Sequence, residues 1–410
     1  MEIDLPNLSI VIGANASGKS NFIQIFKFLN DISQFGLENA ISMQGGSDYL
    51  LNTRLGSSRE FSIEVISDRL EEHLASPYTK RESYGYEVIE TSYGFTIDFS
   101  KQGSSFKILR DYLRQKCKFY TYKKQGRHLE KDRYIGEGEI TIDRRKSSPY
   151  VQIKPPPELS EKTLIDTFLE LDFASGFLKR VKIKPRQLFI ETPTTFPWEI
   201  GDPMKKLFQN ISVYDFDPRL PKKAQPVTGR AQLEADASNL AIVINNILAD
   251  TPKRLKLYNL LSDLLPFVKG FRIQKIADNM LFAVRETYTG AQSFPAFLLS
   301  DGTINLTSLI VCLFFERKSL KIIEEPERNI HPHLISRVMD LMKEESNRTQ
   351  IITTTHNPEV VRHADLGDIL LVSRKRDGFS TIDRPIDKER VRSFLQEEMG
   401  IDELYVQNLL

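Results

Sequence analysis

The stretch Gly13-Ala14-Asn15-Ala16-Ser17-Gly18-Lys19-Ser20 fits the phosphate-binding loop pattern G-x-x-x-x-G-K-[ST] and decides the expected fold. A run of β-forming residues from Leu8 to Ile12 precedes it, and apolar residues at helical spacing follow from Phe22 to Ile32. The pattern counts as evidence only in this context of strand, loop and helix. The sequence therefore predicts a loop whose backbone amides bind a phosphate at the start of a helix.

Four residues in this loop have an expected chemical role. Gly13 and Gly18 let the backbone bend, so that successive N–H groups converge on a phosphate. Lys19 would reach the β- and γ-phosphates of a nucleoside triphosphate, and the Ser20 hydroxyl would ligate Mg²⁺. The residues expected to contact the nucleotide are Gly13, Asn15, Ala16, Ser17, Gly18, Lys19, Ser20 and Asn21.

The composition is typical of a soluble globular protein. Hydrophobic residues make up 40% of the 410 residues and charged residues 27%, and a net charge of +1 gives no overall attraction to nucleic acid or to an anionic membrane. No apolar stretch reaches the roughly 18–20 residues that span a bilayer, and no basic-then-apolar leader opens the chain. We therefore expect a cytoplasmic protein without a membrane partner, in which Cys117 and Cys312 are reduced.

The middle of the chain differs in character from its two ends. β-Forming residues alternate through 59–100, and helix and strand patterns alternate from 298 to about 373, as in a parallel α/β sheet. Residues 101–186 are basic and aromatic and include a helix-like segment at 158–177, and residues 232–268 have a helical pattern. We therefore predict an α/β fold with three parts: a head split between 1–100 and 205–380, an inserted region at 101–204, and a helical tail at 381–410.

A second candidate segment is Leu299-Ser300-Asp301-Gly302-Thr303, which precedes an apolar helical pattern from Leu306 to Phe315. At the start of a helix, a serine hydroxyl and the N–H of a glycine can both bind an anion. The same residues also form an ordinary turn and helix cap. This segment by itself therefore leaves both interpretations open.

A third candidate segment, Leu320 to Glu325, is an apolar strand that ends in two adjacent carboxylates. In open α/β folds, ligands bind at the carboxyl edge of the parallel sheet, where these side chains would lie. Glu324 is expected near the Mg²⁺, and Glu325 is expected to orient and deprotonate the attacking water. A charged strand end that faces solvent is the alternative, but the phosphate loop upstream favours the catalytic interpretation.

The fourth candidate segment is a strand pattern from Gln350 to Thr355 that ends in His356, just before a helix start. The imidazole could hydrogen-bond the γ-phosphate and sense its presence. A single histidine at a strand end is more often only a satisfied polar residue. The order of the four segments along the chain favours the functional interpretation.

The four segments in this order resemble the phosphate loop, signature, double-glutamate Walker B strand and strand-end histidine of ABC-type ATPases of the RecF/Rad50/SMC branch. Within that branch the chain is most similar to the OLD-like, stand-alone predicted ATPases of bacteria. The similarity rests on Glu-Glu-Pro-Glu-x-x-Ile-His-Pro at 324–332, Thr-Thr-Thr-His-Asn-Pro at 353–358 and Ser-Asn-Leu-Ala at 238–241. It covers about residues 1–60 and 205–375.

This resemblance implies an ABC-type head that binds and hydrolyses ATP with Mg²⁺. It also implies that two heads enclose two ATP molecules. In that arrangement one copy contributes Ser300 and Gly302, with Asp301 between them, and the other contributes Lys19, Ser20, Glu325 and His356. Such heads also carry a glutamine that senses Mg²⁺. Gln44 is the candidate here, and a glutamine in a surface loop is an equally good interpretation.

Two further patterns are interpreted as structural. Asp215-Phe216-Asp217 matches the acidic pair of a TOPRIM nuclease, but it lies far from the position of such a domain, and we interpret it as a loop. His331 and His333 lie in the segment that resembles the loop at a dimer seam, and they are not interpreted as metal ligands. Any nuclease chemistry is therefore expected on a partner.

Residues 107–146 form a basic run interleaved with tyrosine and phenylalanine. Such a run could follow a nucleic-acid backbone or dock an acidic partner. A solvated, positively charged face explains it equally well. Its cations are Lys107, Arg110, Arg114, Lys116, Lys118, Lys123, Lys124, Arg127, Lys131, Arg133, Arg144, Arg145 and Lys146.

The leading functional hypothesis is an ATP-hydrolysing homodimer or higher oligomer that serves as sensor or motor subunit of a bacterial anti-phage defence or DNA-maintenance complex. Its effector, for example a nuclease, would act in trans. The alternative is a nucleotide-gated scaffold that holds a toxic effector inactive, with hydrolysis incidental. The subunit of a membrane transporter is disfavoured by the long insertion before Leu299.

Overall fold

The computed structural model describes residues 2–51, 60–68, 71–74, 83–100, 105–125, 128–145, 147–160, 182–192, 202–389, 391, 400–407 and 409. The chain divides into two compact units. The first comprises residues 1–27 and 210–410, and the second comprises residues 28–209.

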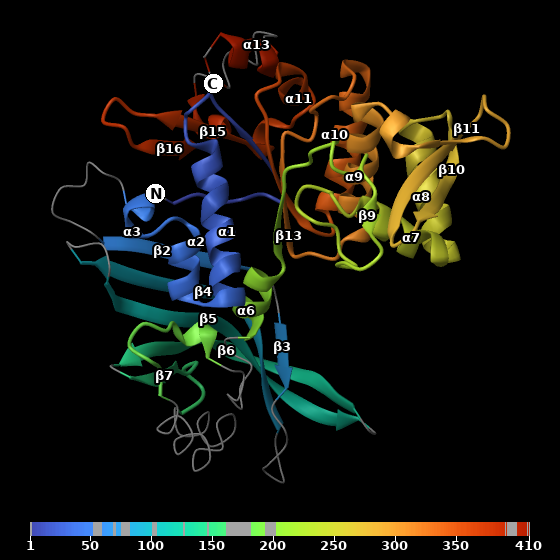
Figure 1. Cartoon of the computed structure of the whole chain (residues 1–410). Helices are drawn as coiled ribbons and strands as arrows, with labels where there is room; N and C mark the ends of the chain where they lie inside the picture. Colours follow the sequence, from blue (N-terminus) through green and yellow to red (C-terminus); the bar gives the residue numbers. More distant parts are fainter. Residues whose placement is uncertain are drawn as a thin grey trace. The chain divides into compact units, whose positions relative to one another are not determined.

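The first unit is built on a six-stranded sheet with the order β16-β15-β1-β14-β13-β8. Figure 1 labels three of its strands, β13, β15 and β16. β1 pairs in parallel with β14 and β15, and β13 pairs in parallel with β14 and β8, whereas β16 is antiparallel to β15. The strands are β1 (Leu8–Ile12), β8 (Ile211–Tyr214), β13 (Leu320–Glu324), β14 (Gln350–Thr354), β15 (Ile369–Arg374) and β16 (Ser380–Asp383).

The central strands of this sheet are buried along their length rather than at alternate residues. All five residues of β1 are buried, and so are the first four of β13. Continuous burial is expected for parallel strands that are covered on both faces. The α/β fold predicted from the alternation of helices and strands is therefore observed in this unit.

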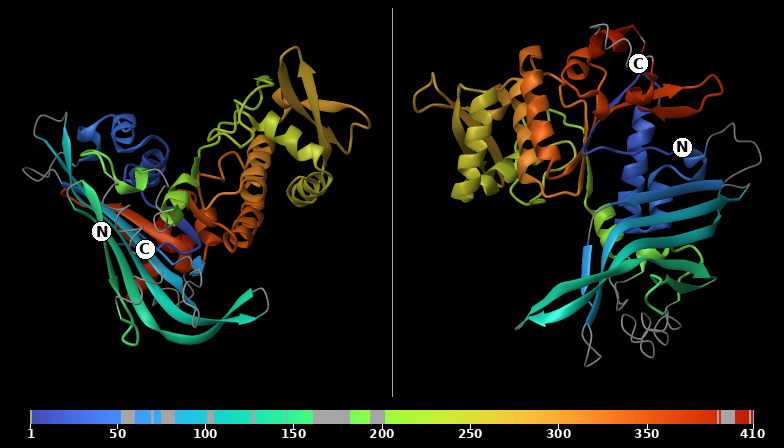
Figure 2. Two further views of the ribbon diagram at one scale, coloured as in Figure 1. Left: turned by 90° about the horizontal axis from the view of Figure 1, so that it is seen from below. Right: turned by 180° about the vertical axis from the view of Figure 1, so that it is seen from behind.

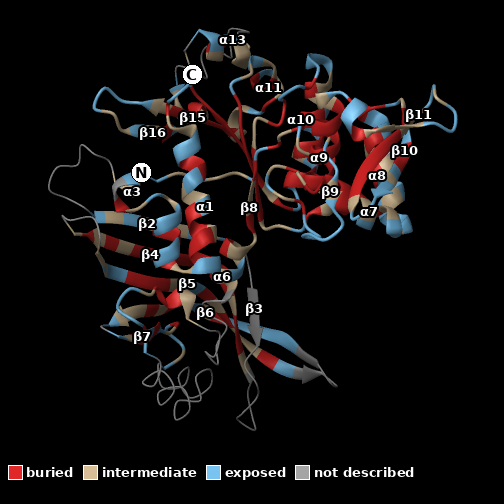
Figure 3. Cartoon of the chain, viewed as in Figure 1, coloured by how far each residue is buried: buried red, intermediate tan, exposed pale blue. Residues whose placement is uncertain are grey.

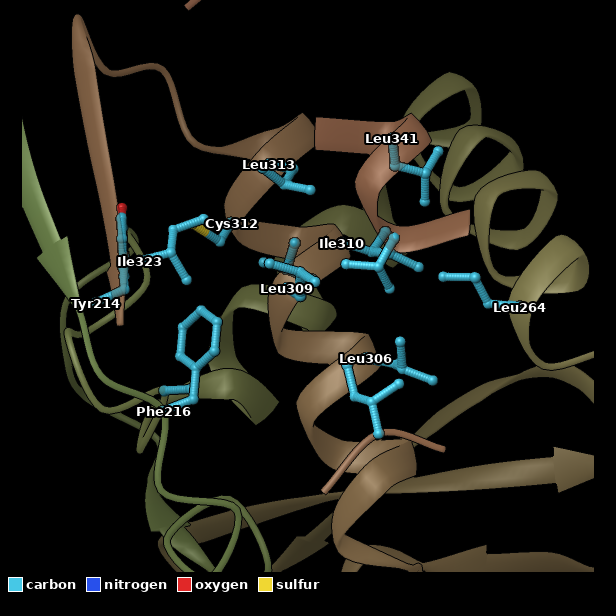
Figure 4. Close-up of a cluster of buried hydrophobic side chains, with 14 of the residues drawn as sticks. Tyr214, Phe216, Leu264, Leu306, Leu309, Ile310, Cys312, Leu313, Ile323 and Leu341 are labelled. Carbon is cyan, nitrogen blue, oxygen red and sulfur yellow. The ribbon is translucent and has the colours of Figure 1, made fainter. Parts of the chain in front are cut away.

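Two helices supply much of the core against this sheet. α9 (Asp301–Phe315) is buried without interruption from Thr303 to Leu313, as expected for a helix that is apolar all round. α10 (Pro332–Ser346) instead buries one stripe, which includes Ile335, Val338 and Met342. Figure 3 shows α9 as buried over most of its length, and Figure 4 shows side chains of α9 in one cluster with Tyr214 and Ile323 of the strands.

A smaller antiparallel sheet with its own helices belongs to the same unit. β10 (Val268–Ile276) pairs with β11 (Asn279–Glu286), which also pairs with β12 (Ser293–Pro295) and β9 (Gln225–Pro226). The helical pattern over 232–268 corresponds to α7 (Leu240–Ala249) and α8 (Thr251–Leu264). Asp250 separates them, because its side chain accepts the N–H of Lys253 and caps α8.

The chain beyond residue 357 adds short elements to the first unit. They are α11 (Pro358–Arg362), α13 (Ile401–Val406) and the 3₁₀ turns η4 (Leu366–Asp368) and η5 (Pro385–Asp387). A further 3₁₀ turn, η3 (Ala296–Leu298), lies earlier in the chain and precedes α9. Arg362 pairs with Asp402 at 2.8 Å and so ties α13 to α11. Residues 381–410 were expected as a helical tail. Their described part instead completes strand β16 before any helix begins.

The second unit contains a six-stranded antiparallel sheet of long, curved strands (Figure 2). Its order is β2-β4-β5-β6-β7, and β3 also pairs with β4. The strands are β2 (Glu60–Ser67), β3 (Glu71–Leu74), β4 (Ser83–Phe99), β5 (Phe106–Gln125), β6 (His128–Arg145) and β7 (Ser148–Lys154). The helical elements are α2 (Leu37–Met43), α3 (Ser47–Leu50), η1 (Phe189–Glu191) and α6 (Asp202–Gln209). α1 (Lys19–Phe35) contributes its residues from Phe28 onward.

The expected boundaries of the head differ from those of the compact units. Residues 28–100 were assigned to the head and 101–204 to an insertion, but both lie in the second unit. The reason is a ladder that pairs β4 with β5 from Ser83–Tyr122 to Phe99–Phe106 and so joins the two ranges into one sheet. The helix expected at 158–177 lies largely outside the described residues.

A buried carboxylate links the second unit's sheet to the segment that follows it. Asp111 on β5 accepts the N–H of Phe189 at 2.8 Å and the hydroxyl of Tyr93 at 3.2 Å, and the Arg144 guanidinium lies 3.8 Å away. Arg144 also donates to the Lys184 carbonyl at 2.7 Å. Burial raises the pKa of Asp111 to about 7, because the surrounding donors compensate only part of the lost solvation.

We expect the second unit to lose stability as the pH rises toward 7. The pKa of Asp111 rises from 3.8 to about 7 on folding, so its stabilising contribution is full below pH 4 and is lost as the pH rises through 7. Asp111→Asn should reduce the loss of unfolding free energy between low and high pH, by at most about 4 kcal/mol. Urea unfolding of wild type and variant at pH 5 and pH 8 measures it, and Asp98→Asn, a partly exposed position on β4, is the matched control. If the unfolding free energies of wild type and Asp111→Asn changed with pH in parallel, Asp111 would not be the source of the pH dependence.

Candidate functional site

The first unit's sheet brings three of the four candidate segments to one edge. Glu324 lies opposite Thr354, and Thr354 lies opposite Val11, in three neighbouring parallel strands. The loops that follow β1, β13 and β14 therefore leave the sheet side by side. These loops carry the phosphate-binding pattern, the catalytic candidate Glu325 and the candidate sensor His356.

The phosphate-binding loop has the backbone that its sequence predicts. Gly13 and Gly18 have φ angles of +150° and +116°, and Ala16 has a φ angle of +62°. A Cβ on Gly13 would lie 2.3 Å from the Val372 carbonyl oxygen, so only glycine fits beside β15. The Ser17 N–H donates to the Ala14 carbonyl at 3.1 Å, which closes the turn.

Lys19 lies within its own loop. Its ammonium donates to the carbonyls of Gly13 at 2.7 Å and Ala14 at 3.2 Å. Burial lowers the pKa of Lys19, and the negative charge of Glu325 opposes that shift. The interaction with Glu325 shows that the loop lysine and the strand-end carboxylate lie within electrostatic range of each other.

A residue far away in sequence supports this loop. The Ser380 hydroxyl, at the start of β16, donates to the Ser17 carbonyl at 2.7 Å. Because the carbonyl of that peptide points to Ser380, its N–H, which belongs to Gly18, points to the opposite side. Ser380 therefore orients one amide of the expected phosphate cradle. No motif in the sequence pointed to Ser380.

We expect Ser380→Ala to weaken nucleotide binding about 3- to 10-fold, since a typical hydrogen bond contributes about 0.5–1.5 kcal/mol net. The affinity of a fluorescent ATP analogue measures this loss. Thr381→Val removes a hydroxyl from the next position of the same strand and should leave the affinity unchanged. Equal losses in the two variants would show that β16, and not the Ser380 hydroxyl, supports the loop.

Glu325 is held in an unusual conformation directly after β13. Its φ angle is +43°, a left-handed value that costs a non-glycine residue about 1–3 kcal/mol. Its N–H donates to the Thr354 carbonyl at 3.0 Å, which ties the strained residue to the neighbouring strand. Strain of this kind concentrates at functional sites.

The Glu325 carboxylate has two charged or polar partners. Oε1 lies 2.8 Å from His356 Nδ1, and Oε2 accepts from Arg328 Nη2 at 3.1 Å. Burial alone would raise the pKa of Glu325, but Arg328 and His356 outweigh it and leave that pKa below its ordinary value. Because the ionised carboxylate can only accept, His356 donates from Nδ1 and leaves Nε2 for another partner.

Glu324 and Asp215 form a second acidic group at the same edge. Burial raises the pKa of Glu324, and the negative charges of Asp215 and Glu325 raise it further. Asp215 follows β8, the strand beside β13, and accepts from Arg328 Nη1 at 2.9 Å. We interpreted Asp215 from sequence as a loop residue. The strand order is what places it near the Walker strand.

Glu327, the next acidic residue, faces the interior instead. Its carboxylate is buried and accepts a short hydrogen bond from the Thr355 hydroxyl. Burial raises the pKa of Glu327. The acidic run after β13 thus has two roles, with Glu324 and Glu325 at the edge of the sheet and Glu327 joining the loops after β13 and β14.

The signature-like segment has clear contacts within its own chain. Ser300 caps α9 by accepting the Thr303 N–H at 3.1 Å, and Asp301 accepts from the Lys222 ammonium. A Cβ on Gly302 would lie 2.6 Å from the Asn329 carbonyl oxygen. The segment therefore forms the ordinary turn and helix cap that its sequence also allows. Gly302 is required for its close packing against the loop after Glu325.

Two other positions considered in the sequence analysis have a defined place within their own unit. Gln44 ends α2 in the second unit, where its N–H donates to the Ala40 carbonyl, and its role as Mg²⁺ sensor stays a prediction. His331 and His333 lie at the start of α10 with their Nδ1 atoms 2.6 Å apart. Within the described part of the chain, no group of three or more His, Cys, Asp or Glu residues could hold a metal ion.

The basic run proves to be two strands with many of its charges paired. Lys116 pairs with Glu90 at 2.7 Å, Lys123 with Asp132 at 2.6 Å, and Lys131 with Glu87 at 3.4 Å. Arg110 lies over the Tyr112 ring. The described residues thus present a mixture of charges rather than a uniformly positive strip. Arg127 and Lys146 lie outside them.

The residues of the first unit fit a nucleoside triphosphate with Mg²⁺. The buried Ser17 hydroxyl, inside the loop, has no hydrogen-bond partner among the described residues, and the positive φ angles turn the loop into a cradle of amides. The Ser20 hydroxyl and Glu324 are oxygen donors of the kind that Mg²⁺ prefers when phosphates supply the rest. Bound there, the ion would neutralise phosphate charge during transfer.

Fold and site together define a P-loop ATPase domain, with a strand-end carboxylate and histidine beside the phosphate loop. The family profile "AAA domain, putative AbiEii toxin, Type IV TA system" matches residues 8–362, and the chain belongs to this family. A search of curated proteins gives no significant match.

The chain is also similar to three solved SMC head domains. The SMC head domain from Thermotoga maritima is 14% identical over 93% of this chain and 92% of that chain, with a TM-score of 0.35. A Pyrococcus furiosus Smc head bound to the C-terminal domain of ScpA is 15% identical over 97% and 94%, with a TM-score of 0.40. An SmcHead bound to the C-winged helix domain of ScpA is 15% identical over 93% and 91%, with a TM-score of 0.38.

None of the helices in the described part of the chain combines the length and the apolar run needed to cross a bilayer.

Proposed function

We propose that this protein binds and hydrolyses ATP with Mg²⁺ and works as the ATPase subunit of a bacterial defence or DNA-maintenance complex. The observation that carries the proposal is the shared sheet edge. There the loop with Lys19 lies within electrostatic range of Glu325, and Glu325 is hydrogen-bonded to His356. The lowered pKa of Glu325 keeps its carboxylate ionised. An ionised carboxylate that His356 holds beside a phosphate cradle can orient a water and accept its proton.

The hydrolytic step follows from these contacts. Loop amides and Lys19 would hold the β- and γ-phosphates, and Ser20 and Glu324 would hold Mg²⁺, which spreads the phosphate charge. Glu325 would take a proton from the attacking water as the bond from the water oxygen to the γ-phosphorus forms and the bond from that phosphorus to the β–γ bridging oxygen breaks, so that ADP leaves. His356 keeps Glu325 in place by donating from Nδ1. In its doubly protonated form, the imidazolium would also donate from Nε2 to a γ-phosphate oxygen.

We further propose that two copies close around two nucleotides, as in the OLD-like group that the sequence resembles. In this arrangement Ser300 and Gly302 of one copy meet the nucleotide held by the other. Both residues lie at the N-terminus of the 15-residue helix α9, whose dipole favours an anion. Their contacts within the chain hold that helix start in shape before a second copy arrives.

A mixing experiment tests the shared site. Lys19→Ala removes the loop cation, and Ser300→Asp keeps the helix cap but sets a negative charge against the phosphate of the other copy. Each variant alone should be inactive. A 1:1 mixture should recover roughly a quarter of wild-type ATPase activity, since half the dimers are mixed and each has one intact site. No recovery, while wild type is active, would contradict the shared site.

The role in defence and the effector in trans are proposed on the family match. Its description names a toxin of a Type IV TA system, which supports a two-component arrangement. In the motor version, hydrolysis drives the effector. In the scaffold version, the ATP-bound state holds a toxic effector and hydrolysis is incidental. Glu325→Gln expressed in the native host separates them, because a motor loses its activity whereas a scaffold keeps its partner bound.

Contact with nucleic acid is a weaker part of the proposal. The cations of the basic run are the basis for it, but their pairing with Glu87, Glu90 and Asp132 leaves fewer charges for a phosphate backbone. We therefore expect weak binding with a shallow salt dependence, measured by fluorescence anisotropy of labelled DNA and RNA at 50 and 200 mM salt. A steep salt dependence would favour a dedicated nucleic-acid surface.

A further inference from the structure

One arginine of the chain itself bridges the acidic residues at the sheet edge. Arg328 donates from Nη1 to Asp215 Oδ1 at 2.9 Å and from Nη2 to Glu325 Oε2 at 3.1 Å. The planar guanidinium presents its donors as a fork, which suits it to hold two carboxylates at once. Without Arg328, three carboxylates would lie at the ends of β8 and β13 with little compensating positive charge. They are those of Asp215, Glu324 and Glu325.

The backbone of Arg328 is fixed independently of this bridge. Its N–H donates to the Glu325 carbonyl at 3.0 Å, and its own carbonyl accepts from Asn305 Nδ2 of α9 at 2.7 Å. The side chain can therefore leave the carboxylates without any change in the loop that carries it.

The exposure of the bridge shows that it contributes little to stability. The side chains of Arg328 and Asp215 are 42% and 57% exposed. Ion pairs this exposed contribute about 0–1 kcal/mol, because water and salt screen them. An interaction this weak is readily exchanged for a stronger one at the same place.

We propose that Arg328 is a positioning residue that neutralises Asp215 and Glu325 in the nucleotide-free protein and gives up both contacts when Mg²⁺ and a triphosphate bind. The inference rests on the proposed ATPase function and deepens it. The guanidinium stands in for part of the charge that Mg²⁺ later brings. It also holds Glu325 beside His356 until the nucleotide arrives.

The proposal predicts how Mg²⁺ and Arg328 depend on each other. Without Mg²⁺, an entering triphosphate meets the carboxylates directly, and Arg328 reduces the repulsion. With Mg²⁺, the ion compensates the same charges, and Arg328 matters less. Removing the arginine should therefore weaken binding mainly when Mg²⁺ is absent.

The test measures the affinity of a fluorescent ATP analogue in Mg²⁺ and in EDTA. We expect Arg328→Gln to increase the ratio of the affinity in Mg²⁺ to the affinity in EDTA about 3- to 10-fold. This is the effect of one charge at this range in a partly exposed site. Arg328→Lys keeps the charge but loses the fork, and it should lie between wild type and Arg328→Gln. The matched control is Arg337→Gln, because Arg337 is 47% exposed and lies near two carboxylates on the outside of α10, Asp263 at 3.0 Å and Asp340 at 4.0 Å.

The alternatives give different results. If Arg328 binds phosphate directly, Arg328→Gln weakens binding by the same factor in Mg²⁺ and in EDTA, and the proposal is overturned. If Arg328→Gln changes neither affinity, the proposal is overturned as well. If wild type binds no nucleotide in either condition, the proposed ATPase function itself fails, and this result is distinct from the other two.

Discussion

Glu325→Gln lowers the ATP turnover number by about 10²–10⁴-fold, the range that a positioned general base contributes. The amide keeps the shape of the side chain and can still accept one hydrogen bond from His356, but it cannot take a proton from water. Nucleotide affinity stays the same or increases, because the substitution removes a negative charge from the neighbourhood of the triphosphate. Steady-state phosphate release gives the turnover number, and equilibrium binding of an ATP analogue gives the affinity.

Asp217→Asn is a suitable control for this substitution. Asp217 lies two residues beyond Asp215, and its carboxylate pairs locally with Arg219 at 2.8 Å. The change from carboxylate to amide is the same, but we expect turnover within about twofold of wild type, as for most surface substitutions. If Glu325→Gln retained most of the activity, the water would have to be activated by another group, and Glu325 would have only a structural role.

Gly18→Ala abolishes most nucleotide binding, with an expected loss of affinity of about 100-fold or more. Two effects combine. An alanine at a φ angle of +116° is strained, and its Cβ would lie 2.3 Å from the Ser380 hydroxyl oxygen. The loop must therefore move, and the amides that converge on the phosphate move with it. Titration calorimetry with ATP and Mg²⁺ measures the loss.

A second substitution separates the two effects. In Gly18→Ala/Ser380→Gly the collision is removed and the backbone strain remains, so binding recovers in part. Gly290→Ala is the control for strain alone, since Gly290 also has a positive φ angle, of +62°, but nothing lies within 4 Å of its added Cβ. It should bind ATP like wild type. Because Ser380→Gly also removes the hydroxyl that supports the loop, the single variant Ser380→Gly is the reference for the double variant. If Gly18→Ala costs as much affinity in that background as in wild type, the whole effect belongs to the backbone.

The sequence predicted those parts of the site that depend on neighbours along the chain. The loop from Gly13 to Ser20 needs glycines at set positions, and the structure has them at positive φ angles. The strand ending at Glu324 and the strand ending before His356 are short runs of mostly β-forming residues, and the structure buries nearly all of both. Because parallel strands end at the same edge, their placement beside the loop also followed from the pattern.

The compact units of the structure have other boundaries than the expected division of the chain, because pairing between distant segments determines them. Residues 59–100 have the alternation of antiparallel strands, but alternation does not say which strands they pair with. β4 pairs with β5 along its whole length, so the basic run became part of the same sheet. The acidic partners of its cations, such as Glu87 and Glu90 on β4, are visible only once that register is known.

The sequence alone determined that this chain has a phosphate loop, a strand-end carboxylate and a strand-end histidine, because each is a local pattern with its own backbone requirement. Only the tertiary structure decided which other residues complete the site. Asp215 lies beside Glu324 because β8 is the neighbour of β13, and Ser380 reaches Ser17 because β16 lies at the end of the same sheet, beside β15. Arg328 joins two of these carboxylates from a loop whose course depends on α9. Such contacts depend on strand order and packing between segments more than a hundred residues apart, which no local pattern encodes.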